Sequence, residues 1–438
     1  MASNMYFGTD GIRGVANVQI TPTLAHSCGN ALTIVKGGCK VVVGRDTRHS
    51  GTMLALAISS GVMQGGGDVI DVGVMPTAGI AYLTKIYRAD YGVVISASHN
   101  PPEYNGIKVF DGKGYKLGEE AESRIESAMA SSKSVEADKI GKYSYMHNAS
   151  DSYISHLVQG ADDLSGIKVL LDCSNGAAFE VAPRAFEMLG ATVTAINVDY
   201  DGKNINVDAG ALHAQLLSDK VVKGGYDFAF AYDGDSDRLI ALDEKGQIVD
   251  GDKILCILAR QMQSVGKLDK MTVVGTSHTN LGIERTLEKE GIKVLRADVG
   301  DKYVLEKMLA VGAKLGGEQS GHVILLDYAT TGDGILTSIV LAGVVKRSGS
   351  RLSELADLPI MPQANLNIVV KDKIRVLNNE QLSALVESKR QSLGQSGRIT
   401  VRASGTEPKL RIMVECEDAE EASSIAEAIR QFVKKLNF

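Results

Sequence analysis

The sequence shows no pattern typical of a protein that crosses a membrane or is exported. It contains no run of about 18 apolar residues, the length needed to span a bilayer. The opening stretch, Met-Ala-Ser-Asn-Met-Tyr-Phe-Gly, has neither a basic flank nor an apolar segment, so no secretory signal is expected. The five cysteines are odd in number and form no CxxC pair. We therefore expect buried, reduced thiols in a cytoplasmic protein, with no disulfide or zinc site and no membrane partner.

Signatures of nucleotide and nucleic-acid binding are also missing. No GxxxxGK[ST] motif occurs, which argues against a P-loop kinase, and no GxGxxG motif supports a dinucleotide-binding fold. The net charge is −6 and no long Lys/Arg run exists, so nucleic acid is not an expected partner. An acidic protein that handles anionic substrates must concentrate its positive charge locally. Arg13, in a glycine-rich loop, and the neighbouring Arg402 and Arg411 fit that need.

A length of 438 residues predicts three or four domains, and the sequence contains a weak internal repeat that supports this division. Three times, an apolar run enters a polar loop, continues into a helical stretch and ends in another apolar run. The three repeats begin at Val41–Asp46, Val169–Asp172 and Thr272–Gly275. Apolar strands that alternate with helices predict βαβ units and parallel-rich sheets. We therefore expect three tandem α/β domains as far as about residue 365.

The remaining C-terminal segment predicts a different, α+β domain. Ala364–Val370 and Leu410–Glu415 are typical of strands. An amphipathic helix should follow, with Asp418 as N-cap and Glu421 as its capping-box partner. The apolar residues at helical spacing are Ile425, Ile429, Phe432, Val433 and Leu436. The preceding Pro359–Pro362 stretch is the candidate hinge.

Three aspartates at alternate positions, Asp233, Asp235 and Asp237, predict a metal site. They lie between two apolar runs, so on a strand–loop–strand turn. Three carboxylates so close together repel one another unless a hard divalent cation neutralises them. A solvated acidic turn is the plain alternative. An EF-hand fits less well, because Arg238 occupies the loop position that requires glycine and the flanks are strands. The pattern therefore favours Mg²⁺.

Ser98 is the candidate nucleophile. It follows the apolar run Tyr91–Ile95, and ligands of open α/β sheets bind where strands end. The neighbouring Asn100-Pro101-Pro102 segment would hold the hydroxyl in a fixed loop. A lone Ser-His pair is usually structural, so this hypothesis depends on the metal site, which could polarise a phosphate carried on Ser98. Lys108 is either a surface lysine or a desolvated acid or base.

Two further polar loops are candidates for substrate binding. In Gly317–His322, Glu318 and Ser320 alternate, so an extended loop would point both at one ligand, as sugar hydroxyls require; an ordinary polar turn is the alternative. In Arg402–Pro408, small hydroxyl residues and a glycine would let backbone N–H groups face an anion while arginine supplies a bidentate fork.

These motifs together resemble the α-D-phosphohexomutase superfamily. The similarity also includes Phe7–Gly14, and the matches run in the expected order from Tyr6 to Glu415. Within the superfamily, Gly317–His322, Thr330–Gly334 and the Gly-Thr-Glu-Pro ending most resemble the bacterial phosphoglucosamine mutases. Three departures are Ser236, where glycine is frequent, Lys302 and His278. Lys302 replaces arginine in a Gly-Asp-Arg-Tyr pattern, which predicts a weakened bidentate contact.

The resemblance implies four domains around a central cleft: three mixed or parallel-sheet α/β domains and a C-terminal α+β domain. It places the catalytic serine in residues 1–150, the metal-binding loop in 151–252, the sugar-binding loop in 253–363 and the phosphate-binding loop in 364–438.

The resemblance also implies a role for each candidate residue. Ser98 would carry the catalytic phosphate as phosphoserine. One Mg²⁺ per chain would be held by Asp233, Asp235, Asp237 and a phosphate oxygen on Ser98. The residues implied to bind substrate are Arg238, Glu318, Ser320, Arg402, Ser404, Gly405, Thr406 and Arg411. Arg13, His99, Lys108 and His322 are candidates for charge stabilisation or proton transfer, with no order among them.

The implied activity is the interconversion of glucosamine 6-phosphate and glucosamine 1-phosphate, which supplies UDP-N-acetylglucosamine for the cell envelope. Phospho-Ser98 would pass its phosphoryl group to the substrate, and the resulting glucosamine 1,6-bisphosphate would return its other phosphate. That bisphosphate, or a similar one, would act as activator. A phosphomannomutase or phosphoglucomutase and a non-catalytic phosphosugar-binding relative are the alternatives, and the assembly, including a homodimer, stays open.

Overall fold

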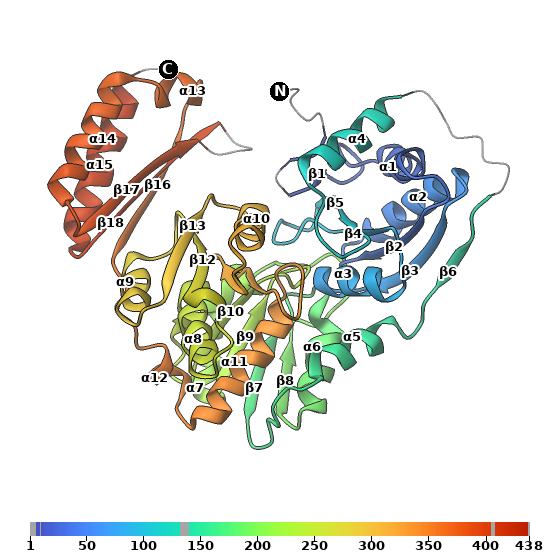
Figure 1. Cartoon of the computed structure of the whole chain (residues 1–438), viewed down its shortest axis with the longest axis horizontal. Coiled ribbons are helices and arrows are strands. Elements are labelled where there is room, and N and C mark those ends of the chain that lie inside the picture. Colours follow the sequence, from blue (N-terminus) through green and yellow to red (C-terminus); the bar gives the residue numbers. More distant parts are fainter. Residues whose placement is uncertain (1–5, 9, 132–139, 404–407, 437–438) are drawn as a thin grey trace. The chain divides into compact units, whose positions relative to one another are not determined.

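The computed structural model describes residues 6–8, 10–131, 140–403 and 408–436 (Figure 1). The chain divides into two compact units. The larger comprises Met1–Thr279 and Glu290–Asp357, and the smaller comprises Asn280–Lys289 and Leu358–Phe438. Within the described residues, no helix is both long enough and apolar enough to cross a membrane.

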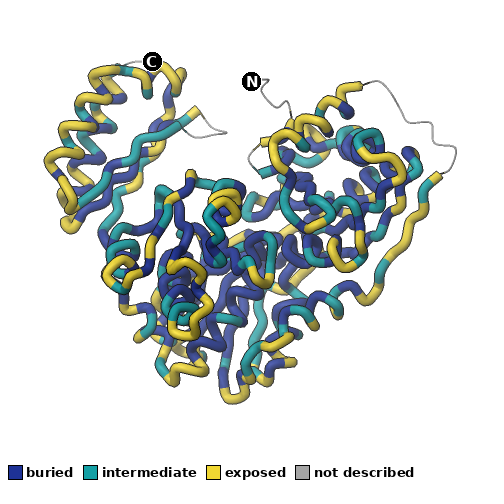
Figure 2. The backbone as a smooth tube through the Cα atoms, viewed as in Figure 1, coloured by how far each residue is buried: buried dark blue, intermediate teal, exposed yellow. Residues whose placement is uncertain are grey.

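The first sheet of the larger unit has six strands in the order β1-β5-β4-β2-β3-β6. Strand β2 pairs in parallel with β3 and β4, and β5 is antiparallel to β4. The central strands are buried on both faces, as the continuous valines of β2 predict, whereas edge strand β6 is exposed (Figure 2). The elements are β1 (Ile12–Val15), α1 (Pro22–Val35), β2 (Lys40–Arg45), α2 (Gly51–Gln64), β3 (Asp68–Val74), α3 (Thr77–Ile86), β4 (Tyr91–Ile95), β5 (Tyr104–Asp111), α4 (Glu119–Ala130) and β6 (Tyr143–Tyr145).

The second sheet has five strands in the order β11-β10-β9-β7-β8. Strand β7 pairs in parallel with β8 and β9, while β10 turns back antiparallel to β9. This hairpin carries the three aspartates in its loop. The elements are α5 (Ala149–Val158), β7 (Lys168–Asp172), α6 (Ala178–Met188), β8 (Thr192–Ile196), the 3-10 helix η1 (Ala211–Leu217), α7 (Ser218–Gly224), β9 (Phe228–Tyr232), β10 (Leu239–Asp243) and β11 (Ile248–Val249).

The third sheet has four strands in the order β13-β12-β14-β15. Strand β12 pairs in parallel with β13 and β14, and β15 is antiparallel to β14. The β14–β15 hairpin carries the Glu318 loop. The elements are α8 (Gly251–Ser264), the 3-10 helix η2 (Asp269–Met271), β12 (Thr272–Thr276), β13 (Lys293–Ala297), α10 (Asp301–Val311), β14 (Leu315–Gly317), β15 (Val323–Leu325), α11 (Gly334–Ser348) and α12 (Leu352–Leu355).

The smaller unit contains an antiparallel sheet in the order β16-β18-β17, with two long helices along one face (Figure 1). Ile412 and Val414 of the sheet share a buried core with Ile425 and Ile429 of the last helix. The Asp418 carboxylate accepts the N–H groups of Glu420 and Glu421, which confirms it as N-cap. The elements are α9 (Leu281–Lys289), β16 (Gln363–Val369), α13 (Lys373–Leu377), α14 (Glu380–Leu393), β17 (Gly397–Ala403), β18 (Lys409–Cys416) and α15 (Ala419–Lys435).

The predicted fold class is confirmed. The three repeats become β2-α2-β3, β7-α6-β8 and β12-α9-β13, and each pair of strands is parallel. Each of the first three sheets also contains antiparallel strands, so all three are mixed. The two compact units divide between Asp357 and Leu358, directly before the proline stretch named as candidate hinge.

Candidate active site

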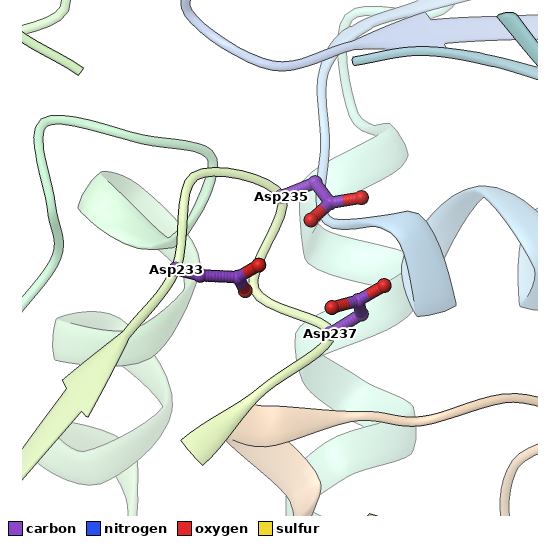
Figure 3. Close-up of side chains that lie close together, drawn as sticks. All are labelled: Asp233, Asp235 and Asp237. Carbon is purple, nitrogen blue, oxygen red and sulfur yellow. The ribbon is translucent and has the colours of Figure 1, made fainter. Parts of the chain in front are cut away.

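The three aspartates converge in the loop between β9 and β10. Asp233, Asp235 and Asp237 are buried and each offers an oxygen within 4.8 Å of the others (Figure 3). The loop is tight at Ser236, which has a left-handed φ of 61°, the conformation that explains why glycine is frequent at such positions. The sequence predicted this cluster from the alternating spacing alone.

The carboxylate oxygens are arranged as a cation site requires. Asp235 Oδ1 and Asp237 Oδ1 are buried and have no hydrogen-bond partner. The second oxygen of Asp235 is fixed by the Thr77 hydroxyl at 2.7 Å, which comes from the first turn of α3. Two buried, unpartnered carboxylate oxygens are costly unless a cation binds them. The residues present therefore fit a hard divalent ion with oxygen ligands.

Electrostatics support the same interpretation. Burial, together with the charges of Asp237 and Asp235, raises the pKa of Asp233 well above its usual range. Burial also opposes ionisation of Asp237, but Lys108 and His322 hold the pKa of that carboxyl well below its usual range. Within one loop, carboxylates therefore compete for few positive partners. A bound divalent cation would relieve this competition.

Ser98 lies against this cluster. It follows the end of β4, is buried, and donates a hydrogen bond from Oγ to Asp233 Oδ2 at 2.6 Å. Its backbone is left-handed, with a φ of 52°. His99 Nδ1 lies 3.3 Å from the same hydroxyl. The structure therefore brings the predicted nucleophile into direct contact with a predicted metal ligand.

Lys108 is a buried cation of the site and not a surface lysine. It stands on β5 beside β4, and its Nζ lies 2.9 Å from Asp235 Oδ2 and 3.3 Å from Asp237 Oδ2. Burial disfavours the ammonium, but Asp10 and the two loop carboxylates outweigh it and hold the pKa of Lys108 well above its usual range.

Arg13 and His99 also reach the serine loop. Arg13 donates to Asn100 Oδ1 at 3.2 Å and forms an ion pair with Asp10. Burial, reinforced by Arg238 and Arg13, lowers the pKa of His99 to about 4, so the imidazole is neutral near pH 7. The structure therefore brings both residues to the serine loop, Arg13 as a cation and His99 as a neutral group.

Arg238 continues the aspartate loop. Its backbone N–H donates to Asp233 Oδ1 at 3.2 Å, and its Nε lies 3.8 Å from Asp237 Oδ1. That Nε is buried and has no hydrogen-bond partner. A buried guanidinium N–H without a hydrogen-bond partner can still donate to a further oxygen.

The β14–β15 hairpin brings Glu318 and His322 to the site. Glu318 is buried, its Oε1 accepts the Gly300 N–H at 3.0 Å, and burial raises its pKa. His322 Nδ1 lies 3.8 Å from Asp237 Oδ1, while its Nε2 lies 3.1 Å from the Gly332 N–H. Burial lowers the pKa of His322 and Asp237 raises it, to about 9 on balance. The Gly332 N–H, however, donates to Nε2, so this contact requires a neutral ring with its proton on Nδ1. We assign the neutral ring to the state in which a cation neutralises Asp237.

The sequence left two alternatives for the loop of Glu318 and Ser320, an extended segment and an ordinary polar turn, and the structure shows the turn. Residues 318–321 form a turn, closed by the Gly321 N–H donating to the Glu318 carbonyl at 2.9 Å. Glu318 is buried and Ser320 is exposed, so alternation does not place both side chains in the same environment. Gly321 allows the turn because its φ is 91° and a Cβ there would lie 2.1 Å from the Leu239 carbonyl oxygen.

Arg402 and Arg411 belong to the smaller unit. They stand directly opposite each other on β17 and β18. Opposite residues of an antiparallel pair share one face of the sheet, so both guanidinium groups can reach one anion. The predicted Ser404, Gly405 and Thr406 lie outside the described residues.

Asp46, Arg48 and Asn206 contact the serine loop but were not predicted from the sequence. Arg48 and Asn206 both donate to the Ser98 carbonyl at 2.9 Å. Asp46 directly follows β2, the parallel neighbour of β4, and its carboxylate accepts the Ser96 hydroxyl. A polar residue at the same sheet edge as Ser98 was the available signal.

The chain matches domain models of one family along most of its length. The models describe phosphoglucomutase/phosphomannomutase, with alpha/beta/alpha domain I at residues 4–136, domain II at 151–246, domain III at 250–360 and the C-terminal domain at 366–432.

Similar curated proteins cover the chain almost completely. A phosphoglucosamine mutase from Desulforamulus reducens is 46% identical over 437 residues, with 98% of each chain covered. One from Clostridium kluyveri is 45% identical over 445 residues, with 98% of this chain and 99% of the relative covered. Among solved structures, a phosphoglucomutase/phosphomannomutase family protein from Burkholderia thailandensis has a TM-score of 0.84 at 26% identity, covering 99% of this chain and 98% of that one.

Proposed function

The chain belongs to the phosphoglucomutase/phosphomannomutase family of α-D-phosphohexomutases, and we propose that it interconverts glucosamine 6-phosphate and glucosamine 1-phosphate through a phosphorylated Ser98. One observation carries this proposal. The Ser98 hydroxyl lies 2.6 Å from Asp233, in a cluster whose other two aspartates each keep a buried oxygen without a hydrogen-bond partner. A nucleophile beside a set of oxygen ligands for a divalent cation is suited to phosphoryl transfer.

Mg²⁺ is the proposed cofactor. Asp233, Asp235 and Asp237 would hold it, with a phosphate oxygen on Ser98 as a further ligand. When bound, Mg²⁺ withdraws charge from the phosphoryl oxygens and so makes the phosphorus easier to attack. Thr77 and Lys108 both donate to Asp235 Oδ2, which leaves Asp235 Oδ1 for the ion.

The reaction consists of two transfers related by reversal. In the first, the free hydroxyl oxygen of glucosamine 6-phosphate bonds to the phosphorus on Ser98, and the bond from phosphorus to Ser98 Oγ breaks. The hydroxyl loses one proton and Ser98 Oγ gains one, so the balance is closed by proton transfer between them. The bisphosphate then turns and returns its other phosphate to Ser98, which releases glucosamine 1-phosphate.

The surrounding residues are proposed to stabilise charge and to orient the phosphoryl group during the transfer. Lys108, held as an ammonium beside Asp235 and Asp237, is proposed to stabilise the charge that develops around the transferring phosphoryl group. Arg13, His99 and His322 are proposed to orient or stabilise the phosphoryl group. Lys108 and Arg13 are already in place as cations, so they require no rearrangement at the moment of transfer.

Substrate recognition is proposed for two groups of residues. Glu318, Ser320 and Arg238 would bind the sugar and its hydroxyl groups, and Glu318 is already oriented by the Gly300 N–H. The phosphate that does not react would be bound by Arg402, Ser404, Gly405, Thr406 and Arg411. A sugar bisphosphate would serve as activator, and we place the enzyme in the cytoplasm.

The substrate assignment is tested by comparing kcat/KM for the 1- and 6-phosphates of glucosamine, glucose and mannose, with glucose 1,6-bisphosphate as activator. We expect the amino sugar to be preferred. A clear preference for glucose or mannose phosphates would replace this assignment by the phosphoglucomutase or phosphomannomutase alternative. No turnover of any substrate, with phosphosugar binding retained, would instead favour the non-catalytic relative.

A further inference from the structure

The Arg48 guanidinium is enclosed by the loop that carries Ser98. Its side chain is fully buried, and each of its five N–H groups has a partner. Nη2 donates to the carbonyl oxygens of Ser98 at 2.9 Å and Asn100 at 2.7 Å. Nη1 donates to the carbonyl oxygens of Pro101 and Tyr104, and Nε donates to Asp46 at 2.9 Å. One planar group therefore gathers four carbonyl oxygens of a single loop.

Asp46 completes this arrangement from the other side. Its carboxylate accepts the Arg48 N–H at 3.0 Å as well as Nε, and it also accepts the Ser96 hydroxyl. The Ser96 oxygen in turn accepts the Ser98 N–H at 2.8 Å. Both backbone polar groups of Ser98 are thus fixed, the carbonyl by Arg48 and the amide through Ser96 and Asp46.

This fixation matters because Ser98 has an unfavourable backbone. Its φ of 52° lies in the left-handed region, which is unfavourable for a residue other than glycine. A loop without support would relax, and the hydroxyl would leave Asp233. Asn206 supports the same geometry, since its amide donates to the Ser98 and Asn100 carbonyl oxygens at 2.9 and 3.1 Å.

We propose that Arg48 is a positioning residue which, together with Asp46, holds the Ser98 loop so that Oγ stays at the metal cluster throughout the transfer. The inference rests on the proposed function, because it assigns Arg48 to the phosphoryl-transfer step and not to sugar binding. Arg48 itself contacts neither the aspartate cluster nor the sugar-binding hairpin in any described hydrogen bond or ion pair.

Arg48→Lys separates geometry from charge. Lysine keeps the positive charge that balances Asp46 in the interior, so the buried carboxylate is not left alone. A lysine ammonium has only three donors around one point, so it cannot serve four carbonyl oxygens and a carboxylate. The loop should therefore shift while the fold is retained.

The experiment compares kcat, KM and the rate of Ser98 phosphorylation in wild type and R48K. Glucosamine 6-phosphate is the substrate, glucose 1,6-bisphosphate is the phosphoryl donor, and intact mass reports the phosphorylated fraction. A displacement of about 1 Å can lower a rate about 10²-fold, so we expect a loss of this size in kcat and in the phosphorylation rate, with KM unchanged. Arg45→Lys is the matched control, because Arg45 is the last residue of β2, three positions before Arg48, and pairs with Asp71 at 3.2 Å. We expect it to leave kcat and KM unchanged.

Ser96→Ala provides a second variant that alters no charge. It removes the acceptor of the Ser98 N–H and should lower kcat about fivefold, the change in rate that corresponds to one hydrogen bond of about 1 kcal/mol. If R48K does not fold, the kcat of S96A tests the inference by itself.

The possible results are distinct. Unchanged kcat in folded R48K or in S96A would overturn the inference, as would an effect confined to KM. A loss in R48K that R45K reproduces would also overturn it, since any weakened buried ion pair would then suffice. Failure of the proposed function would be visible in wild type itself, which would gain no phosphate on Ser98 and convert no phosphosugar.

Discussion

The left-handed backbone of Ser98 predicts an unusual order of stability among its variants. Ser98→Ala and Ser98→Gly both remove the hydroxyl, so they lose the same hydrogen bond to Asp233. They differ in Cβ, which is strained at a φ of 52°. Elsewhere, glycine is the less stable choice, because it gains more freedom in the unfolded chain and buries less apolar surface.

Ser59 supplies the reference for the ordinary effect. It lies inside α2, and its relative exposure of 1% equals that of Ser98. Its hydroxyl has no hydrogen-bond partner, so its variants lose no such contact. The difference in free energy of unfolding between S59G and S59A measures the combined effect of glycine's freedom in the unfolded chain and of the apolar surface that Cβ buries. Subtracting it from the difference between S98G and S98A leaves the backbone strain, which we expect to favour S98G by about 1–2 kcal/mol.

Urea unfolding of the four variants measures this double difference, provided that they share one m value. A double difference near zero would refute the strained geometry at Ser98. The same proteins test the nucleophile. Both Ser98 variants should lose all turnover and gain no phosphate by intact mass, whereas both Ser59 variants should remain active. Activity in folded S98A or S98G would refute the covalent role.

Two further perturbations test the metal cluster and a buried ion pair. Mg²⁺ at 100 times its Kd should stabilise wild type by about 2.7 kcal/mol, seen as a rise in Tm. Asp235→Asn should abolish this rise together with activity, and an undiminished rise would contradict the metal assignment. Glu122→Gln leaves the buried Lys302 without the partner that lies 3.5 Å away and should destabilise by about 3 kcal/mol. Urea unfolding should show that the double variant E122Q/K302M recovers much of the stability that E122Q loses. If both variants lose the same free energy of unfolding, the ion pair does not matter.

Lys302 illustrates where inference from the sequence ends. Replacement of arginine by lysine suggested a weakened bidentate contact, but the ammonium lies near Glu122 of α4, 180 positions away in the chain. Asp301, the preceding residue, pairs with Lys116 at 3.0 Å. Such ion pairs depend on which helices and strands become neighbours in the fold, and the spacing of charges along the sequence does not indicate which these are.

The meeting of the three aspartates and the place of Ser98 were predictable because their signals are local. Three carboxylates at alternate positions on one turn must meet wherever the turn lies, and Ser98 had to stand at the end of its strand. The environment of the Glu318 side chain was harder to predict from the sequence, because alternate side chains of a loop point in the same direction only if the loop is extended. The turn closed by Gly321 removed that condition.

The support of Ser98 was unpredictable for a deeper reason. Arg48 binds carbonyl oxygens, which every residue possesses, so no residue type in the loop marks the contact. The meeting of Asp46 with Ser96 depends on strand order, which places β2 directly beside β4. Neighbouring strands lie about 4.8 Å apart, and one intervening strand would have doubled the gap beyond hydrogen-bond reach. The position of the reactive hydroxyl is therefore a property of the sheet's order as much as of the residues around Ser98.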